Sequence, residues 1–277
     1  MKIDVHVHIL SPEFIQEIRG NMERDAHFKM LHASPKSKFA TAETLLENME
    51  KTGIDQSVVF GFPYHDLGMC RESNDYIIDA VRRYPNRLIG FAVVPPQDPD
   101  MENELVRCRQ AGLRGAGEIV PLAVHTDISD QGQVGRFAAI CRDLDFPILM
   151  HTNELVGHYY PGKGRIGPEQ AYLFAVQNPD NKIILAHWGG GLFFYELMPE
   201  LRQSLRHVFY DTAASPFLYR PDVYRVARLA GVLDKVLLGS DFPLLSPARY
   251  YEEWSAAGIT KEEKAGIWGG NAARFGI

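Results

Sequence analysis

The chain has 277 residues, of which 45% are hydrophobic and 23% charged, as is usual for a folded globular protein. Its formal net charge is −6, which argues against nucleic-acid binding, because that binding usually needs a basic face. No apolar run reaches the roughly 18 residues of a membrane span, so we expect neither nucleic acid nor membrane as a partner.

The cysteines indicate a reducing environment. Cys70, Cys108 and Cys141 form no CxxC pair, and an odd number argues against a full disulfide framework. An expected strand begins at Ile3, which leaves no room for a signal peptide ahead of it. We therefore expect reduced thiols in a cytoplasmic protein.

Short apolar, β-branched runs alternate with longer segments whose apolar residues follow a helical spacing. The expected strands are Ile3–His8, Ser57–Phe62, Leu88–Val94, Leu113–Ile119, Pro147–His151, Ile183–His187, Val208–Asp211 and Val236–Ser240. The expected helices are Thr44–Thr52, Asn74–Tyr84, Pro99–Ala111, Gln133–Leu144, Pro168–Asn178, Phe194–Leu205 and Pro221–Ala230. Continuously apolar strands are typical of a sheet covered on both faces.

Eight strand–helix units predict a single α/β domain over residues 1–277, a TIM-like (β/α)8 barrel, since such barrels take about 250 residues. The alternative is an open doubly wound sheet, whose first and last strands need not be neighbours. Three stretches are less regular: 21–42, 65–71 and 153–167. We interpret 21–42, which follows the first strand region, as a lid or a subunit contact.

Six side chains of metal-binding type stand at the ends of five expected strands: His6, His8, Glu118, His151, His187 and Asp241. The carboxyl ends of parallel barrel strands meet at one mouth, so we expect these side chains to converge there. Imidazoles and carboxylates bind divalent metals. We expect Zn²⁺, with Mn²⁺ or another divalent ion as the alternative, and one or two ions.

Each of these residues also has a purely structural interpretation. His6 and His8 project to the same face of a strand, and without a metal both rings would need hydrogen-bond partners inside the barrel. Asp241 can begin a turn, and Glu118 can pair with Arg114. The coincidence of all six at strand ends favours the metal site.

Longer motifs resemble the amidohydrolase superfamily. Within it they resemble the branch that includes aminocarboxymuconate-semialdehyde decarboxylase, resorcylate decarboxylases and pyrone-dicarboxylate lactonase. The matching segments include DVHVH, YPNRLIGFAVVPP, GLRGAGEI, PILMHT, KIILAHWGGG and LLGSDFPLL. The resemblance spans nearly the whole chain and implies a metal-dependent enzyme. Relatives are often dimers, so it also implies a homodimer as one alternative.

The resemblance assigns roles to particular positions. It implies one metal held by His6, His8, His151 and Asp241. It implies for His187 either proton handling, as in decarboxylases of the branch, or a ligand role, as in two-metal relatives. Glu118 departs from the decarboxylase pattern and is similar to the bridging glutamate of TatD-like hydrolases.

We predict a metal-dependent hydrolase of a small anionic ester, lactone or amide. The metal would lower the pKa of bound water to about 7, Asp241 would act as general base, and His187 would stabilise the developing charge. The alternative is a non-oxidative decarboxylase of a small unsaturated or aromatic carboxylic acid. Glu118 bound to metal favours hydrolysis, and Glu118 paired with Arg114 favours decarboxylation. A third interpretation is a non-catalytic barrel with a structural metal.

Substrate recognition is expected from the loop after the fifth strand, HTNELVGHYYPGKGRIG. Cationic side chains between glycines suit a substrate carboxylate, and an ordinary solvated loop is the alternative. The candidate substrate-binding residues are His158, Tyr159, Lys163 and Arg165, together with Arg71 after the second strand.

Overall fold

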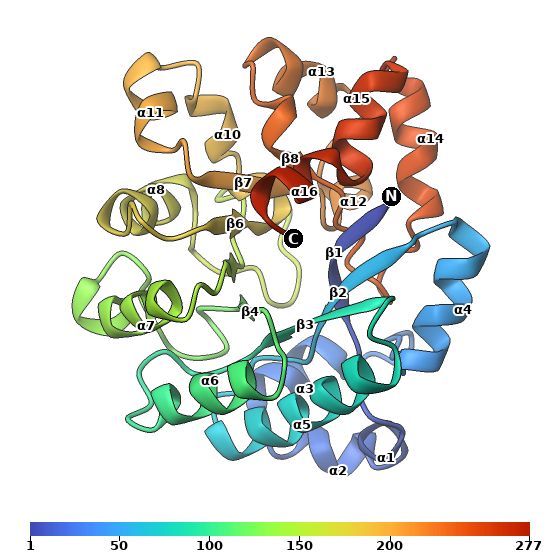
Figure 1. The fold of residues 1–277 in the computed structure, drawn as a ribbon, viewed down its shortest axis with the longest axis vertical. Helices are drawn as coiled ribbons and strands as arrows, with labels where there is room; N and C mark the ends of the chain where they lie inside the picture. Colours follow the sequence, from blue (N-terminus) through green and yellow to red (C-terminus); the bar gives the residue numbers. More distant parts are fainter.

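The computed structural model describes residues 1–277, and its parallel strands form one sheet in the order β1 to β8. The strands lie inside a ring of helices (Figure 1). Their bounds are β1 Ile3–His8, β2 Gln56–Phe60, β3 Leu88–Ala92, β4 Gly115–Ile119, β5 Ile148–Met150, β6 Ile183–Leu185, β7 Val208–Asp211 and β8 Val236–Leu237. The predicted (β/α)8 barrel is thus confirmed, and the open doubly wound sheet is excluded.

The barrel closes between its first strand and the segment that follows β8. The amide of Val5 donates to the carbonyl of Leu238 at 2.8 Å, and the amide of Asp241 donates to the carbonyl of His6 at 3.0 Å. Buried Asp4 adds a side-chain link, because its carboxylate accepts from the amide of Ser240 at 2.9 Å. These bonds join the first strand to the segment after the last strand and so close the barrel.

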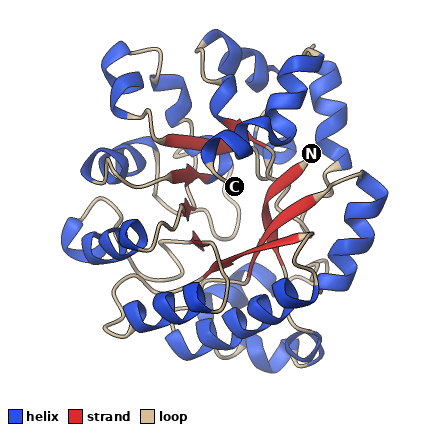
Figure 2. Cartoon of the chain, in the orientation of Figure 1, coloured by secondary structure: helices blue, strands red, loops and turns tan.

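Helices cover the outside of the barrel (Figure 2). Those of the first half are α1 Pro12–Gln16, α2 Ile18–Met22, α3 Ala26–His32, α4 Ala42–Thr52, α5 Leu67–Arg83, α6 Met101–Gln110 and α7 Gln131–Asp143. Those of the second half are α8 Pro168–Gln177, α9 Ala186–Gly189, α10 Leu192–Tyr195, α11 Pro199–Ser204, α12 Ser215–Leu218, α13 Asp222–Leu229, η1 Leu233–Lys235, α14 Ala248–Ala256, α15 Lys261–Ala265, η2 Gly266–Gly270 and α16 Asn271–Phe275.

Several helix boundaries differ from the predicted ones for local reasons. The helix expected over 194–205 is broken into α10 and α11, because Pro199 has no amide hydrogen and begins a new helix instead. The stretch 21–42, expected to be irregular, contains α3, whose first turn is capped by the Asp25 carboxylate at 2.7 Å from the amide of Phe28. Helix α5 begins at Leu67, earlier than expected, because Asp66 caps it.

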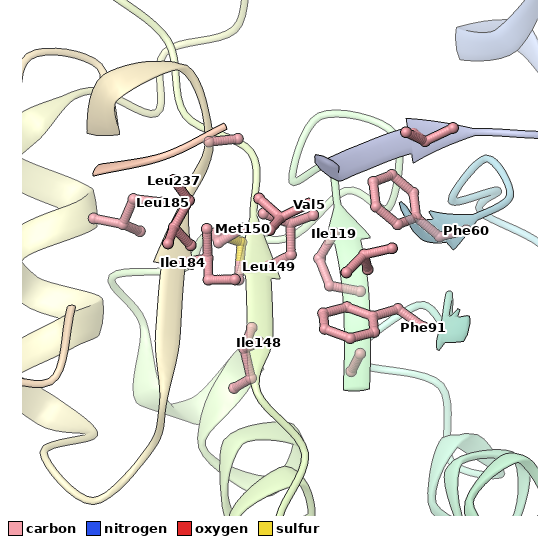
Figure 3. Packing of buried hydrophobic residues seen from close by; sticks show 14 of the residues in the cluster. Val5, Phe60, Phe91, Ile119, Ile148, Leu149, Met150, Ile184, Leu185 and Leu237 are labelled. Atoms are coloured by element: carbon pink, nitrogen blue, oxygen red, sulfur yellow. The ribbon is translucent and has the colours of Figure 1, made fainter. Parts of the chain in front are cut away.

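Apolar side chains from neighbouring strands fill the barrel and the space beneath the helices. Figure 3 shows part of this packing, with Phe60, Phe91, Ile119, Ile148 and Leu185 among the labelled side chains. All five are buried. This core fixes the strand ends, and the polar side chains stand at these ends or just beyond them.

The cysteines Cys70, Cys108 and Cys141 are buried and free, as predicted. None of the helices combines the length and the apolar character needed to cross a membrane. The cytoplasmic location and the absence of a nucleic-acid partner stay predictions.

Candidate metal centre

Six side chains far apart in the sequence meet at the carboxyl end of the barrel strands. His6 and His8 belong to β1, and Glu118 to β4. His151 follows β5 directly, and His187 lies in the short α9 after β6. Strands five and six end earlier than expected, so these two histidines stand just beyond the sheet. Asp241 lies in the segment after β8 that pairs with β1.

The first group of candidate ligand atoms comes from the first strand, the fourth strand and the segment after the last strand. The Nε2 atoms of His6 and His8 both lie 3.7 Å from Oδ1 of Asp241. They lie 3.5 and 3.4 Å, respectively, from Oε2 of Glu118. Ligand atoms about 2.1 Å from a shared ion lie roughly 3.0–3.5 Å from one another, so these four atoms surround a point where a divalent cation fits.

A second group lies on the other side of the Glu118 carboxylate. Its Oε1 atom is 2.9 Å from Nδ1 of His151 and 3.5 Å from Nε2 of His187. Nε2 of His187 is also 3.1 Å from Nδ1 of His151. The structure therefore places His151 with Glu118 and His187, whereas the resemblance grouped it with His6, His8 and Asp241. Which atoms bind an ion stays a prediction.

Hydrogen bonds on the far side of three rings set their tautomers. Nδ1 of His6 is 2.9 Å from the Asp211 carboxylate, Nδ1 of His8 is 3.2 Å from the carbonyl of Gly61, and Nδ1 of His187 is 2.9 Å from the carbonyl of Ala213. These oxygens can only accept, so each Nδ1 donates a proton. When a ring is neutral, its Nε2 then carries a lone pair that points toward the centre.

The buried charges around Glu118 attract positive charge to the centre. Burial by itself lowers the pKa of His6, but Glu118 and Asp211 outweigh it and raise that pKa well above its usual value. The pKa of His187 is likewise raised, to about 9, because its bond to Glu118 outweighs burial. Burial acts to raise the pKa of Glu118, yet His6 and His151 hold it well below its usual range. The negative charges that favour protonated histidines here also favour a bound metal cation.

The fit to a cation rests on an unpartnered buried atom. His6 is fully buried, and its Nε2 has no hydrogen-bond partner. A buried nitrogen without a partner is costly, and a metal bond would satisfy it. Two imidazoles with two carboxylates form a donor set that suits Zn²⁺ or Mn²⁺, so the residues present fit a divalent ion.

The backbone is specialised where it carries these side chains. His187 and Asp241 adopt left-handed conformations with φ of 55° and 62°, which cost non-glycine residues about 1–2 kcal/mol each. Gly117, beside Glu118, has φ of 129°, and a Cβ there would lie 2.3 Å from the carbonyl oxygen of Leu149. Only glycine suits that position, so β4 delivers Glu118 to the centre through a turn that other residues would block.

A cavity of about 630 Å³ opens above the centre. The ligand-type side chains in its lining are His8, Glu118, His151, His187 and Asp241. Most other lining side chains are apolar or aromatic, and many come from 27–40. Pockets of this size and composition are typical of small-molecule sites.

The expected substrate-binding residues are distributed unevenly around this cavity. His158 lines it. Tyr159 is 77% exposed and does not, and the ammonium of Lys163 donates to the carbonyls of Val156 and His158 within its own loop. Arg165 is exposed and also lies outside the lining.

Arg71 lies away from the cavity, because its guanidinium pairs with Asp100 and Glu104. Arg114 does not pair with Glu118. It lines a different, smaller cavity with Arg109 and Asp145. The structural interpretation of Glu118 as an ion-pair partner of Arg114 is thus wrong.

Two features of the site escaped the sequence analysis. Asp211 is fully buried and binds the ring of His6, and its other oxygen accepts the amide of His187 at 3.0 Å. Its position at the end of a strand was visible, but nothing in the sequence paired it with a histidine two hundred residues away. The second feature is the group of aromatic side chains that 27–39 contributes to the cavity lining, because this stretch has no strong periodicity.

A family model described as Amidohydrolase matches residues 3–275. The chain belongs to the amidohydrolase family. The predicted resemblance to this superfamily is therefore confirmed. Its relatives are enzymes, which supports the prediction that this protein is an enzyme too. A γ-resorcylate decarboxylase of Polaromonas sp. (strain JS666) is 24% identical to this amidohydrolase over 249 residues, which is 73% of this chain and 74% of the relative.

Solved structures share the fold. A 5-carboxyvanillate decarboxylase from Sphingomonas paucimobilis superposes with a TM-score of 0.77 at 17% identity, over 99% of this chain and 98% of the other. A dihydroxybenzoic acid decarboxylase from Polaromonas sp. JS666, with bound manganese and the inhibitor 2-nitroresorcinol, gives a TM-score of 0.73 at 19% identity, over 99% and 96% of the two chains.

These relatives overturn the predicted reaction. Three curated matches from Polaromonas, Rhizobium and Rhodococcus are γ-resorcylate decarboxylases, so the expected hydrolase of esters, lactones or amides is wrong. Glu118 led to the hydrolase prediction, because a carboxylate at this position departs from the decarboxylase pattern and is similar to the bridging glutamate of TatD-like hydrolases. The same ligand types serve either reaction, since a divalent ion can activate water or hold a carboxylate.

Proposed function

We propose that this amidohydrolase is a divalent-metal-dependent, non-oxidative decarboxylase of a small aromatic or unsaturated carboxylic acid. The observation that carries the proposal is the run of decarboxylases among the curated relatives. The cavity is compatible with it, because an apolar, aromatic-lined space opens directly onto the ligand-type side chains. Manganese in a relative's structure makes Mn²⁺ the first ion to test.

The proposed ion site consists of His6, His8 and Asp241, with Oε2 of Glu118 as the fourth atom. A divalent ion bound there would hold an acidic substrate and withdraw charge from it. Asp211 and the carbonyl of Gly61 keep the rings of the two histidines oriented from behind. The remaining oxygen of Glu118 faces His151 and His187 and can exchange protons with them.

Decarboxylation needs a proton at the carbon that loses the carboxylate. The carbon–carbon bond breaks, CO₂ leaves, and the electron pair that remains on the substrate carbon takes up the proton. We assign the delivery to His187, whose ring is fixed by its Nδ1 bond to Ala213 and whose Nε2 faces the cavity floor. After each turnover solvent would supply a new proton to that Nε2, and the Glu118 carboxylate, 3.5 Å away, would favour the protonated ring.

The test uses Mn²⁺-loaded protein with 2,6-dihydroxybenzoate and 5-carboxyvanillate, and measures CO₂ release and product mass in D₂O. We expect release of CO₂ and incorporation of about one carbon-bound deuterium per product molecule. His187→Gln should lower the rate about 100-fold or more, which is the usual scale of a lost proton donor.

His207→Gln is the matched control, because that ring bonds the carbonyl of Ala175 outside the cavity. It should leave the rate unchanged. Hydrolysis of ester or lactone substrates without CO₂ release from any acid would overturn the proposed reaction.

A further inference from the structure

The cavity above the centre is much larger than one hydroxylated benzene ring requires. Its volume is about 630 Å³, whereas an apolar cavity of about 150 Å³ is enough to hold a benzene molecule. A compact benzoic acid bound at the ligand-type side chains would leave most of this space unfilled. The lining of the remaining space therefore indicates what else the substrate carries.

An aromatic wall, defined here as His27, Phe28, His32, Phe39 and Phe62, forms one side of that space. Its rings contact one another in series. The centroids of Phe28 and Phe62 lie 5.0 Å apart, those of Phe28 and His32 4.5 Å, and those of His32 and Phe39 5.2 Å. The ring of His27 stacks on Phe62. Phe28 meets Phe62 edge-on, and the other two pairs are tilted, so the rings form one continuous aromatic surface without lying in one plane.

The aromatic wall carries no charge at neutral pH. Burial lowers the pKa of His27 and of His32 to about 4. Arginine is absent from the lining of the cavity, and its lysines, Lys36 and Lys38, are exposed. The ammonium of Lys38 is occupied by the carbonyl of Leu244. The five rings of the aromatic wall therefore offer no cationic partner to a second anionic group.

We infer that the substrate class is aromatic acids with two fused or linked rings, the second ring lying on the aromatic wall. The inference rests on the proposed function for the acid group, which would bind at the metal centre. It deepens that proposal by assigning the part of the cavity that a one-ring acid leaves empty.

The test compares the affinity of Mn²⁺-loaded protein for 2,6-dihydroxybenzoate and for 1-hydroxy-2-naphthoate by calorimetry, with CO₂ release measured for both. Burial of the additional ring should make the naphthoate bind about tenfold more tightly or better. Phe39→Ala should remove most of this preference. Phe194→Ala, at a 53% exposed ring outside the cavity, is the matched control and should preserve it.

A second variant covers the case in which Phe39→Ala does not fold. Leu31→Trp places a larger side chain in the lining beside the wall, and it should weaken naphthoate binding at least fivefold while leaving the one-ring acid within about twofold. Equal affinity for both acids in the wild-type protein would overturn the inference, even if the one-ring acid is decarboxylated. Tighter naphthoate binding with no CO₂ from either acid would support the inference and overturn the proposed reaction.

Discussion

At the scale of the residue, Asp211 has the widest influence on the centre. One oxygen binds Nδ1 of His6 at 2.9 Å, and the other accepts the amides of His187 and Ala213. A single carboxylate thus fixes the tautomer of a histidine on the first strand and the left-handed turn that carries the histidine after the sixth strand. Such supporting carboxylates orient metal-binding imidazoles and raise their basicity.

Asp211→Asn should weaken Mn²⁺ binding about 10- to 100-fold while the protein stays folded. The asparagine amide would donate a hydrogen bond to Nδ1 of His6, where the carboxylate accepts one. The proton of the ring would then sit on Nε2, which faces the ion site. Titration of free Mn²⁺ by electron paramagnetic resonance measures the affinity, and circular dichroism checks the fold. Asp143→Asn, at an exposed helix end, is the control. Unchanged affinity in Asp211→Asn would show that this carboxylate does not orient the ligand.

At the scale of the element, α14 carries a buried acid that opposes folding at high pH. Glu253 is 8% exposed, and its Oε2 has no hydrogen-bond partner. Burial raises the pKa of Glu253 to about 7. Because the folded pKa lies above the unfolded one, the stability that this group contributes is present at acidic pH and is lost as the pH rises from about 4.5 through 7.

Glu253→Gln should therefore raise stability at pH 8 by roughly 1 kcal/mol, after allowance for solvent near the helix surface, and change it little at pH 5. For a chain of this size the melting temperature at pH 8 should rise by about 2 °C. Thermal unfolding of both proteins at the two pH values tests this. The neighbouring exposed Glu252→Gln provides the control, and an equal effect at both pH values would contradict the assignment of the charge.

At the scale of the whole molecule, the proposed ion would join parts of the barrel that are distant in sequence. His6 and His8 come from the first strand, Glu118 from the fourth, and Asp241 from the segment that closes the barrel. An ion bound only by the folded chain stabilises it by mass action, by about 2.7 kcal/mol at a concentration 100 times its Kd. Metal content and global stability should therefore change together.

Removal of metal by a chelator should lower the melting temperature by several degrees, and added Mn²⁺ should restore it. A variant combining His6→Ala and His8→Ala should show no response to Mn²⁺. Elemental analysis of the loaded protein counts the ions, and we expect one per chain. Two per chain would mean that Glu118, His151 and His187 hold a second ion. No effect of Mn²⁺ on the wild-type protein would contradict the site.

Local sequence determined the strands, most of the helices and the type of chemistry. Apolar runs specify strands because the barrel is buried on both faces, and polar side chains at their ends must meet because parallel strands share one mouth. The break at Pro199 and the caps at Asp25 and Asp66 were readable in principle, since they depend on neighbouring residues. The reaction was not readable, because one ligand set serves both hydrolysis and decarboxylation.

Only the tertiary structure decided which side chains contact one another. It placed His151 beside Glu118, bound Asp211 to His6, and tied Lys163 to its own loop. It also assembled the aromatic wall beside the centre from Phe62 and from residues of 27–39, a stretch without strong periodicity. Contacts between residues more than two hundred positions apart depend on strand register and helix packing across the whole barrel, which no local pattern in the sequence records.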